Sequence, residues 1–94
     1  MKPLIKFGVN INNREPLIAA DYTLPDLLDI SEVVENEVFD SVWVGDSLFS
    51  KPRYEPLSLM SAISQRTEKI RLGTACLVTA TRNPLYLALE WATL

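Results

Sequence analysis

The sequence predicts a parallel α/β fold built from three strand–helix units. Short apolar runs rich in β-branched residues alternate with longer segments whose apolar residues recur at helical spacing. The apolar runs are too far apart to be joined as hairpins, so neighbouring strands should be parallel and connected by right-handed crossovers. A capping residue or a proline marks the start of each helical segment.

Each element has its own signals along the chain. Thr23 is a capping residue before the first helical segment, with proline and an acidic residue in the first turn. Pro56 fits the first turn of the second segment, and Asn83-Pro84 gives the third an N-cap followed by proline. Val38 follows the first segment, and because a β-branched residue is poor in a left-handed cap, that helix should end in another way. The predicted strands are residues 4–11, 41–46 and 70–78, and the predicted helices are residues 24–37, 56–67 and 84–94.

The helical segments carry apolar inner faces that a three-stranded sheet does not fully cover. These faces comprise Leu24, Leu27, Leu28, Val34 and Val38, then Leu59, Met60, Ile63 and Thr67, and finally Leu85, Ala88, Trp91 and Leu94. A parallel sheet expects cover on both faces, and three strands leave two unpaired edges. The sequence therefore predicts the opening portion of a (β/α)8 TIM barrel, whose usual length is about 250 residues. We expect residues 1–94 to be the N-terminal part of one such domain, truncated within its third helix.

Composition and charge exclude several classes of function. With 48% hydrophobic residues and a net charge of −3, the chain is a globular segment, and it has no basic stripe to bind nucleic acid. No apolar run is long enough to cross a membrane, and the N-terminus lacks the apolar core of a signal peptide. These features and the single cysteine predict a cytoplasmic location. The absence of histidine removes the commonest general base and the commonest metal ligand, and no metal site is predicted.

Polar residues follow the predicted strands at the edge where parallel α/β folds bind ligands. The central strand is followed at once by Asp46 and Ser47. Asp46 can orient a ligand through charge-assisted hydrogen bonds or cap the turn that follows, and we favour the ligand. For Ser47, the sequence fits a ligand contact and a hydrogen bond within the local turn equally well. At the end of the first strand, Asn10 and Asn12 fit two interpretations equally well, contact with a substrate or hydrogen bonding within the turn.

Two other residues also have both a functional and a structural interpretation. Arg53 is suited to bidentate binding of an anion on a substrate, but a solvated arginine, or one paired with Glu55, fits the sequence equally well. Cys76 lies in an apolar strand with no base nearby, so a buried, inert thiol is the favoured interpretation.

Five segments carry a resemblance to a known family. They are residues 39–48, 52–57, 71–75, 82–84 and 92–94. In order and spacing they resemble the bacterial luciferase-like flavin-dependent oxidoreductases. This resemblance implies an enzyme whose (β/α)8 barrel binds reduced flavin mononucleotide (FMN), or the deazaflavin coenzyme F-420, at the carboxyl ends of the strands. Members that use FMN activate dioxygen and oxygenate a small organic substrate, whereas the deazaflavin members transfer hydride.

The same resemblance implies site residues and partners. It places cofactor contacts at Asp46, Ser47, Thr74, Ala75 and Cys76, with a non-prolyl cis peptide between Ala75 and Cys76 beneath the flavin ring. Trp43 is then more typical of the core than of a platform for the flavin. Many members have histidine after the acidic residue of the central strand, where this chain has Ser47, so no catalytic acid or base is assigned. A flavin reductase or another source of reduced flavin is implied as a partner, and a homo-oligomer is expected.

The length of the chain leads to a negative expectation about activity. Three units supply only part of a flavin site, because the phosphate-binding part of such barrels usually comes from the last strands. We therefore expect the 94-residue chain alone neither to bind flavin tightly nor to turn over, and its exposed apolar faces to favour self-association. The alternative is a non-catalytic α/β remnant or a protein-interaction segment.

Overall fold

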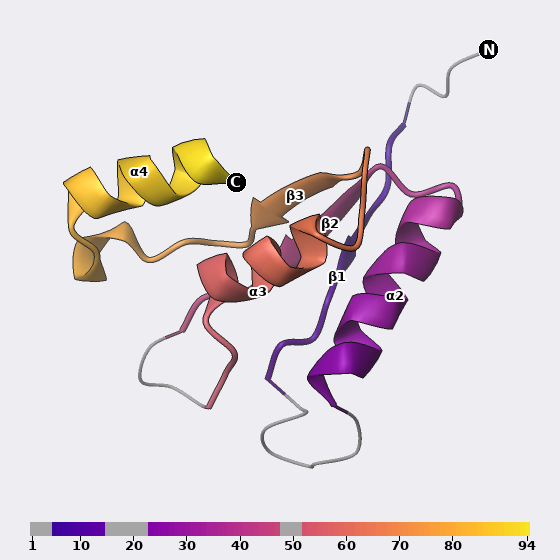
Figure 1. Ribbon diagram of the computed structural model, residues 1–94, viewed down its shortest axis with the longest axis horizontal. Coiled ribbons are helices and arrows are strands. Elements are labelled where there is room, and N and C mark those ends of the chain that lie inside the picture. The colour runs from indigo at the N-terminus through magenta and orange to yellow at the C-terminus, as the bar shows by residue number, and fades with distance from the viewer. Residues whose placement is uncertain (1–4, 15–22, 48–51) are drawn as a thin grey trace.

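The chain folds into a three-stranded sheet with its helices packed on one side. The computed structural model describes residues 5–14, 23–47 and 52–94. Both strand pairings, in the order β1-β2-β3, are parallel, which confirms the predicted alternation of strands and helices. The elements are β1 (Gly8–Asn10), α2 (Leu24–Asn36), β2 (Ser41–Val44), α3 (Pro56–Ser64), β3 (Arg71–Thr74), the 3-10 helix η1 (Thr79–Thr81) and α4 (Pro84–Thr93) (Figure 1).

The strands are shorter than the sequence predicts. The strand expected over 70–78 ends at Thr74, because the N–H of Val78 donates to the side chain of Asp46 (2.8 Å) and the chain then turns into η1. β2 ends at Val44, before the predicted end at 46. Within the strand expected over 4–11, only Gly8–Asn10 is assigned as strand, and residue 4 lies outside the described residues.

The helices begin at the predicted signals, but all three end earlier than predicted, α2 and α4 by one residue and α3 by three. The N–H of Thr23 donates to Oδ2 of Asp26 (2.7 Å), as in a capping box. α2 ends at Glu37, whose backbone is extended and whose N–H donates to the carbonyl of Val34, so the C-cap residue is not left-handed. Val38 was wrongly placed on the inner face and is 85% exposed, because it lies beyond the helix. α3 ends at Ser64, where the next two N–H groups bond three residues back and close the helix.

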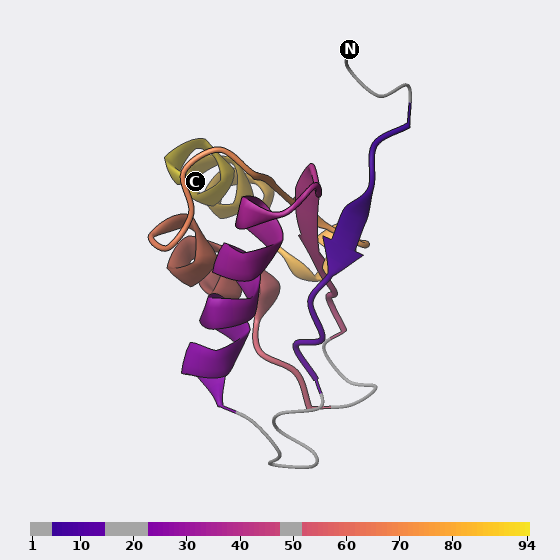
Figure 2. The same cartoon turned by 90° about the vertical axis from the view of Figure 1, so that its right-hand side faces the viewer.

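The core lies between the sheet and the helices on one of its faces. Figure 2 shows α2, α3 and α4 to one side of the strands, with the opposite face of the sheet uncovered. Along β2, Val42 and Val44 are buried toward the helices, whereas Trp43 is exposed. The inner faces predicted for α2 and α3 supply most of the remaining core. The buried apolar residues are Ile11, Leu27, Val34, Val42, Val44, Leu57, Leu59, Met60 and Ile63.

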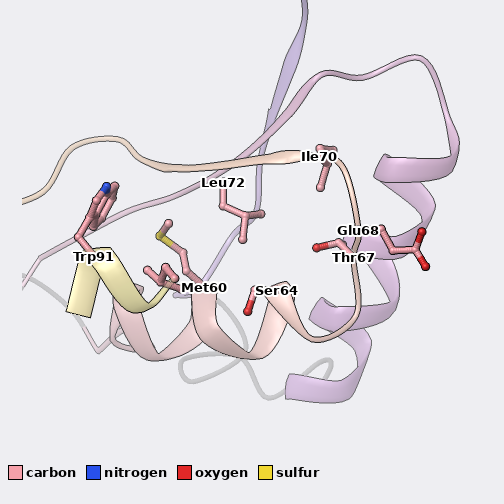
Figure 3. Close-up of a pocket in the computed structure, with 8 residues that line it drawn as sticks. Met60, Ser64, Thr67, Glu68, Ile70, Leu72 and Trp91 are labelled. Atoms are coloured by element: carbon pink, nitrogen blue, oxygen red, sulfur yellow. The ribbon is translucent and has the colours of Figure 1, made fainter. Parts of the chain in front are cut away.

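α4 adds little to this core. None of its residues is buried, so the inner face predicted for it, which includes Leu85 and Trp91, is not covered by the described part of the chain. Trp91 instead borders an open cavity of about 340 Å³ between α3, β3 and α4, opposite Met60 and Leu72 (Figure 3). Within the described ranges, no helix is both long enough and apolar enough to cross a bilayer.

Glu35 ties the end of α2 to the turn that enters β3. Its Oε2 atom accepts hydrogen bonds from the N–H groups of Glu68 (2.8 Å), Lys69 (2.8 Å) and Ile70 (3.0 Å). The N–H of Ile70, followed by that of Lys69, holds the pKa of Glu35 below its ordinary value. One carboxylate thus satisfies three successive backbone donors and sets where the third strand begins.

Replacing Glu35 by glutamine is expected to flatten the dependence of stability on pH in the acid range. The folded pKa is lower than the unfolded one, so the stabilisation is present above the unfolded pKa and is lost as pH falls through the folded pKa. Urea unfolding between pH 3 and 7 measures this effect. Glu90→Gln, on exposed α4, is the matched control and should retain the wild-type profile. Parallel wild-type and Glu35→Gln profiles would contradict the assignment.

Candidate functional site

The carboxyl ends of β1 and β2 are joined by one buried side chain, Asn13. Only 1% of Asn13 is exposed. Its side-chain Nδ2 donates to the carbonyl oxygens of Gly45 (2.9 Å) and Tyr54 (2.9 Å). The backbone carbonyl of Asn13 accepts the N–H of Tyr54 (2.8 Å). These bonds bring together the residues that follow β1, those that follow β2 and those that enter α3.

Arg53 rests against this junction. Its Nη1 donates to Oδ1 of Asn13 (2.9 Å), and a Cβ added at Gly45 would overlap the guanidinium. Glu55 binds elsewhere, so the Arg53–Glu55 pair considered from the sequence does not form. Beside Arg53 is an open pocket of about 280 Å³, and the described residues lining it are Asn10, Ile11, Asn12, Asn13, Arg14 and Arg53.

Asp46 joins the end of β2 to the segment after β3. One carboxylate oxygen accepts both the N–H of Val78 (2.8 Å) and Nη2 of Arg82 (3.0 Å). The side chains of Asp46 and Arg82 are only 8% and 18% exposed. The structure therefore gives Asp46 a partner far along the chain, in addition to the two roles weighed from the sequence. These two bonds of Asp46 do not cap the turn that follows β2, because their donors, Val78 and Arg82, lie after β3.

Arg82 also reaches the start of α3. Its Nη1 donates to Glu55 (3.0 Å), and the other carboxylate oxygen of Glu55 accepts the N–H of Ser58 (2.7 Å) as the N-cap of α3. Burial disfavours the charged form of Arg82, but the bonds to Asp46 and Glu55 outweigh it and raise the pKa of the guanidinium. A permanently charged Arg82 therefore links β2, α3 and the start of α4.

The residues expected to contact the cofactor lie along the same edge of the sheet. Ser47, half-buried, lies three residues after the end of β2, and Thr74 ends β3 and borders a second pocket beneath α4. The peptide bond between Ala75 and Cys76 is cis, as the resemblance implied. The expectation of a buried thiol at Cys76 was wrong, because the chain leaves the sheet after Thr74 and the side chain is exposed.

Trp43 lies on the uncovered face of the sheet. It is 39% exposed, so its placement in the core was wrong, because its side chain points away from the helices. Nε1 donates to the hydroxyl of Ser41 (2.7 Å). A Cβ added at Gly8 would come within 2.5 Å of the indole, and one at Gly73 would do the same. The indole therefore reaches over both neighbouring strands, over Gly73 at its own level on β3 and over Gly8 two residues earlier on β1, and a side chain at either glycine would overlap it.

Replacing Gly73 by alanine is expected to lower the free energy of unfolding by about 1–2 kcal/mol, because the new Cβ must displace the indole. The fluorescence of Trp43 should also shift to the red as the ring becomes more exposed, measured in a Trp91→Phe background. The control is the same substitution in a Trp43→Leu background, where the clash is relieved and the loss should be smaller. An equal loss in both backgrounds would refute the contact.

The uncovered sheet face and the end of β3 carry residues that fit a flat cofactor ring. Trp43 provides an aromatic plane, and Ala75 and Cys76 are small and exposed beyond the end of β3. The carboxylate of Asp46 is nearly buried and already bound to Arg82 and Val78, so it is less available to a ligand than the sequence suggested. These residues suit contacts to an uncharged ring better than to a phosphate.

Sequence reasoning missed Asn13 and Arg82 as parts of this site. Asn13 carries no local signal, because its partners are 32 to 41 residues away in the sequence. Arg82 lies in one of the segments that carried the family resemblance. A carboxylate as nearly buried as Asp46 requires a positively charged partner, and this requirement is the signal that could have led to Arg82.

Comparison with known proteins identifies a family for this chain. The family model described as luciferase-like monooxygenase matches residues 5–94, which is nearly the whole chain. A search among proteins with curated descriptions found no match. The match extends over all three strands, the segment after β3 and α4. The chain therefore belongs to the luciferase-like monooxygenase family.

Proposed function

We propose that this chain supplies part of the cofactor and substrate site of a flavin-dependent monooxygenase acting on a small organic molecule. The observation that carries the proposal is the family match over residues 5–94 together with the uncovered sheet face. On that face, Trp43 lies level with Asn10 and Gly73 in the strand register. Polar and small side chains thus surround an aromatic plane at the edge where parallel α/β folds bind ligands.

The cofactor we propose is reduced FMN, with coenzyme F-420 as the alternative. Bound reduced flavin supplies electrons to dioxygen, and the deazaflavin supplies hydride. In this chain, the backbone of Ala75 and Cys76 and the side chains of Thr74 and Ser47 would hold the ring. Asp46 fixes the segment that carries Cys76, because it accepts the N–H of Val78, just before η1, and the guanidinium of Arg82, just after η1. Asp46 is thus a positioning residue.

The proposal includes the rest of the domain and its partners. The uncovered sheet face and the exposed residues of α4 support three units of a (β/α)8 barrel in which further units cover these surfaces. A separate source of reduced flavin is a partner in this scheme. A second proposed function is self-association through α4, because Leu85, Tyr86 and Leu89 are all exposed on this helix.

Titration of the chain with FMN and with F-420, followed by backbone NMR, tests the proposed function. We expect weak binding, with a dissociation constant above about 100 μM, that perturbs Thr74, Ala75 and Cys76, because the site is incomplete. Adenosine monophosphate, which has a phosphate but no flavin ring, is the control and should leave these amides unchanged. No perturbation at millimolar flavin would contradict the proposal. Binding at micromolar concentration or tighter would show that three units form a complete site.

A further inference from the structure

Glu55 lies at the start of α3, and hydrogen bonds connect it to the segment after β3. We propose that Glu55 is a positioning residue for residues 75–77, which we call the arch, and that it acts on the arch through Arg82. The inference rests on the proposed function, because the arch includes residues proposed to hold the cofactor ring. It is supported by the anchors of the arch, by the sharing of one oxygen of Asp46 and by the two bonds that Glu55 makes.

The arch is fixed at both ends to the carboxyl end of β2. At its start, the N–H of Ala75 donates to the carbonyl of Val44 (2.8 Å). Directly after the arch, the N–H of Val78 donates to Oδ2 of Asp46 (2.8 Å). The first anchor is a backbone bond that continues the pairing of β2 with β3, whereas the second depends on a side chain. The conformation that the arch presents to a ligand therefore depends on how firmly Asp46 holds Val78.

The second anchor shares its acceptor with Arg82. Oδ2 of Asp46 accepts both the N–H of Val78 and Nη2 of Arg82 (3.0 Å). Only 8% of the side chain of Asp46 is exposed, so water competes little for this oxygen. A charged donor binds a carboxylate more strongly than a neutral N–H does. The position of the guanidinium therefore decides how well the same oxygen can also accept the N–H of Val78.

Glu55 holds the guanidinium from the other side. Its Oε1 accepts Nη1 of Arg82 (3.0 Å), and its Oε2 accepts the N–H of Ser58 (2.7 Å), so the carboxylate is itself fixed to α3. Without Glu55, Arg82 is free to bind both oxygens of Asp46 in the bidentate geometry that guanidinium and carboxylate groups favour. That rearrangement draws Oδ2 away from Val78 and releases one end of the arch.

The start of α3 also connects the arch to the junction at Asn13. Tyr54 directly precedes Glu55, and both its N–H and its carbonyl bond to Asn13. A shift of the residues before α3 therefore moves Glu55 and, through Arg82, changes the anchor of the arch. In this way the end of β1 and the segment after β3 adjust together, although they do not lie on neighbouring strands.

Backbone 15N relaxation of the ligand-free chain tests the coupling in a Glu55→Ser variant. Serine is a good N-cap, so its hydroxyl can still accept the N–H of Ser58, but it is too short to reach Arg82. We expect the order parameters of the arch and of Val78 to fall from about 0.85 toward about 0.6, whereas that of Ser58 should stay unchanged. An arch that remains as rigid as in the wild type would refute the coupling.

Asn83→Ala is the matched control. Asn83 is exposed, follows Arg82 directly and accepts the N–H of Leu85 as the N-cap of α4. The substitution removes one capping bond close to Arg82 but leaves the bonds of Glu55 and Asp46 in place, so the arch should stay ordered. Equal loss of order in Asn83→Ala and Glu55→Ser would show that the arch responds to any nearby weakening, and it would overturn the inference.

A double variant tests whether the effect passes through Arg82. Arg82→Lys keeps the charge but lacks the planar fork that bridges two carboxylates. If Glu55 acts through Arg82, adding Glu55→Ser to Arg82→Lys should reduce the order of the arch no further. Losses that add would refute the route through Arg82. Glu55→Ser changes a side chain that is 46% exposed and keeps the cap of α3, so it remains informative if Arg82→Lys does not fold.

An FMN titration of the same variants separates a positioning role from a merely structural one. We expect Glu55→Ser to weaken the response of Ala75 and Cys76 to FMN at least about threefold, because a less ordered arch loses more conformational freedom on binding. Asn83→Ala should respond as the wild type does. Unchanged FMN affinity beside a disordered arch would overturn the positioning role. A wild-type chain that does not respond to millimolar FMN would contradict the proposed function, while the order parameters would still decide the coupling.

Discussion

Replacing Asp46 by alanine is expected to lower the free energy of unfolding by about 3 kcal/mol, near the lower end of the range for removing one partner of a buried ion pair. The substitution leaves the guanidinium of Arg82 with the more exposed Glu55 as its remaining acidic partner, and it leaves the N–H of Val78 without its acceptor. Urea unfolding followed by tryptophan fluorescence measures the loss. Asp46→Asn should recover part of it, because an amide oxygen can still accept the N–H of Val78.

The matched control for Asp46 is Asp29→Ala. Asp29 also pairs with an arginine, Arg66, but 64% of its side chain is exposed. An exposed ion pair contributes at most about 1 kcal/mol, because water and salt screen it. Comparable losses for the two alanine variants would show that the burial of Asp46 does not matter, and the proposed role of Asp46 in holding the segment after β3 would fail.

Replacing Asn13 by alanine is expected to lower the free energy of unfolding by about 3 kcal/mol, because it leaves the buried carbonyl of Gly45 and the partly buried carbonyl of Tyr54 without their donor and frees Arg53. The pocket that Arg53 borders should lose its fixed shape at the same time. Hydrogen exchange at Tyr54 provides a local readout, because its N–H bonds to the carbonyl of residue 13, and exchange there should accelerate more than in the helices.

Asn12→Ala is the control for Asn13, since Asn12 is the same residue type one position earlier and is exposed. Its Oδ1 accepts the N–H of Arg14 within a local turn. We expect a loss below about 1 kcal/mol, as for an exposed polar contact. A larger loss for Asn12 than for Asn13 would show that the turn, rather than the buried junction, joins the strand ends.

These two junctions have a common consequence for the site. Asn13 joins β1 to β2 and to the residues before α3, and Asp46 with Arg82 joins β2 to the segment after β3. Side chains therefore connect the three strand ends where backbone pairing stops. A ligand at this edge meets groups that are held by buried hydrogen bonds, which favours binding because less conformational freedom is lost.

The sequence by itself determined the alternation of strands and helices. Period-two and helical patterns, together with Thr23, Pro56 and Asn83-Pro84, act within a few residues of one another, so their effects can be read locally. The parallel pairing also followed, because segments separated by helices cannot pair as hairpins. The family resemblance followed from the order and spacing of short segments, and the family match over residues 5–94 confirms it.

Only the tertiary structure decided which side chains at the strand ends are bound and which are available. The sequence placed Asp46 at the ligand edge but did not identify Arg82 as its partner, and it left open whether Arg53 pairs with Glu55. It also placed Trp43 in the core and buried Cys76, whereas the uncovered sheet face exposes the first and the end of β3 exposes the second. The partners in these junctions are 27 to 41 residues apart in the chain. Such pairs form only when folding brings the strand ends together, and burial then makes their hydrogen bonds and charges matter.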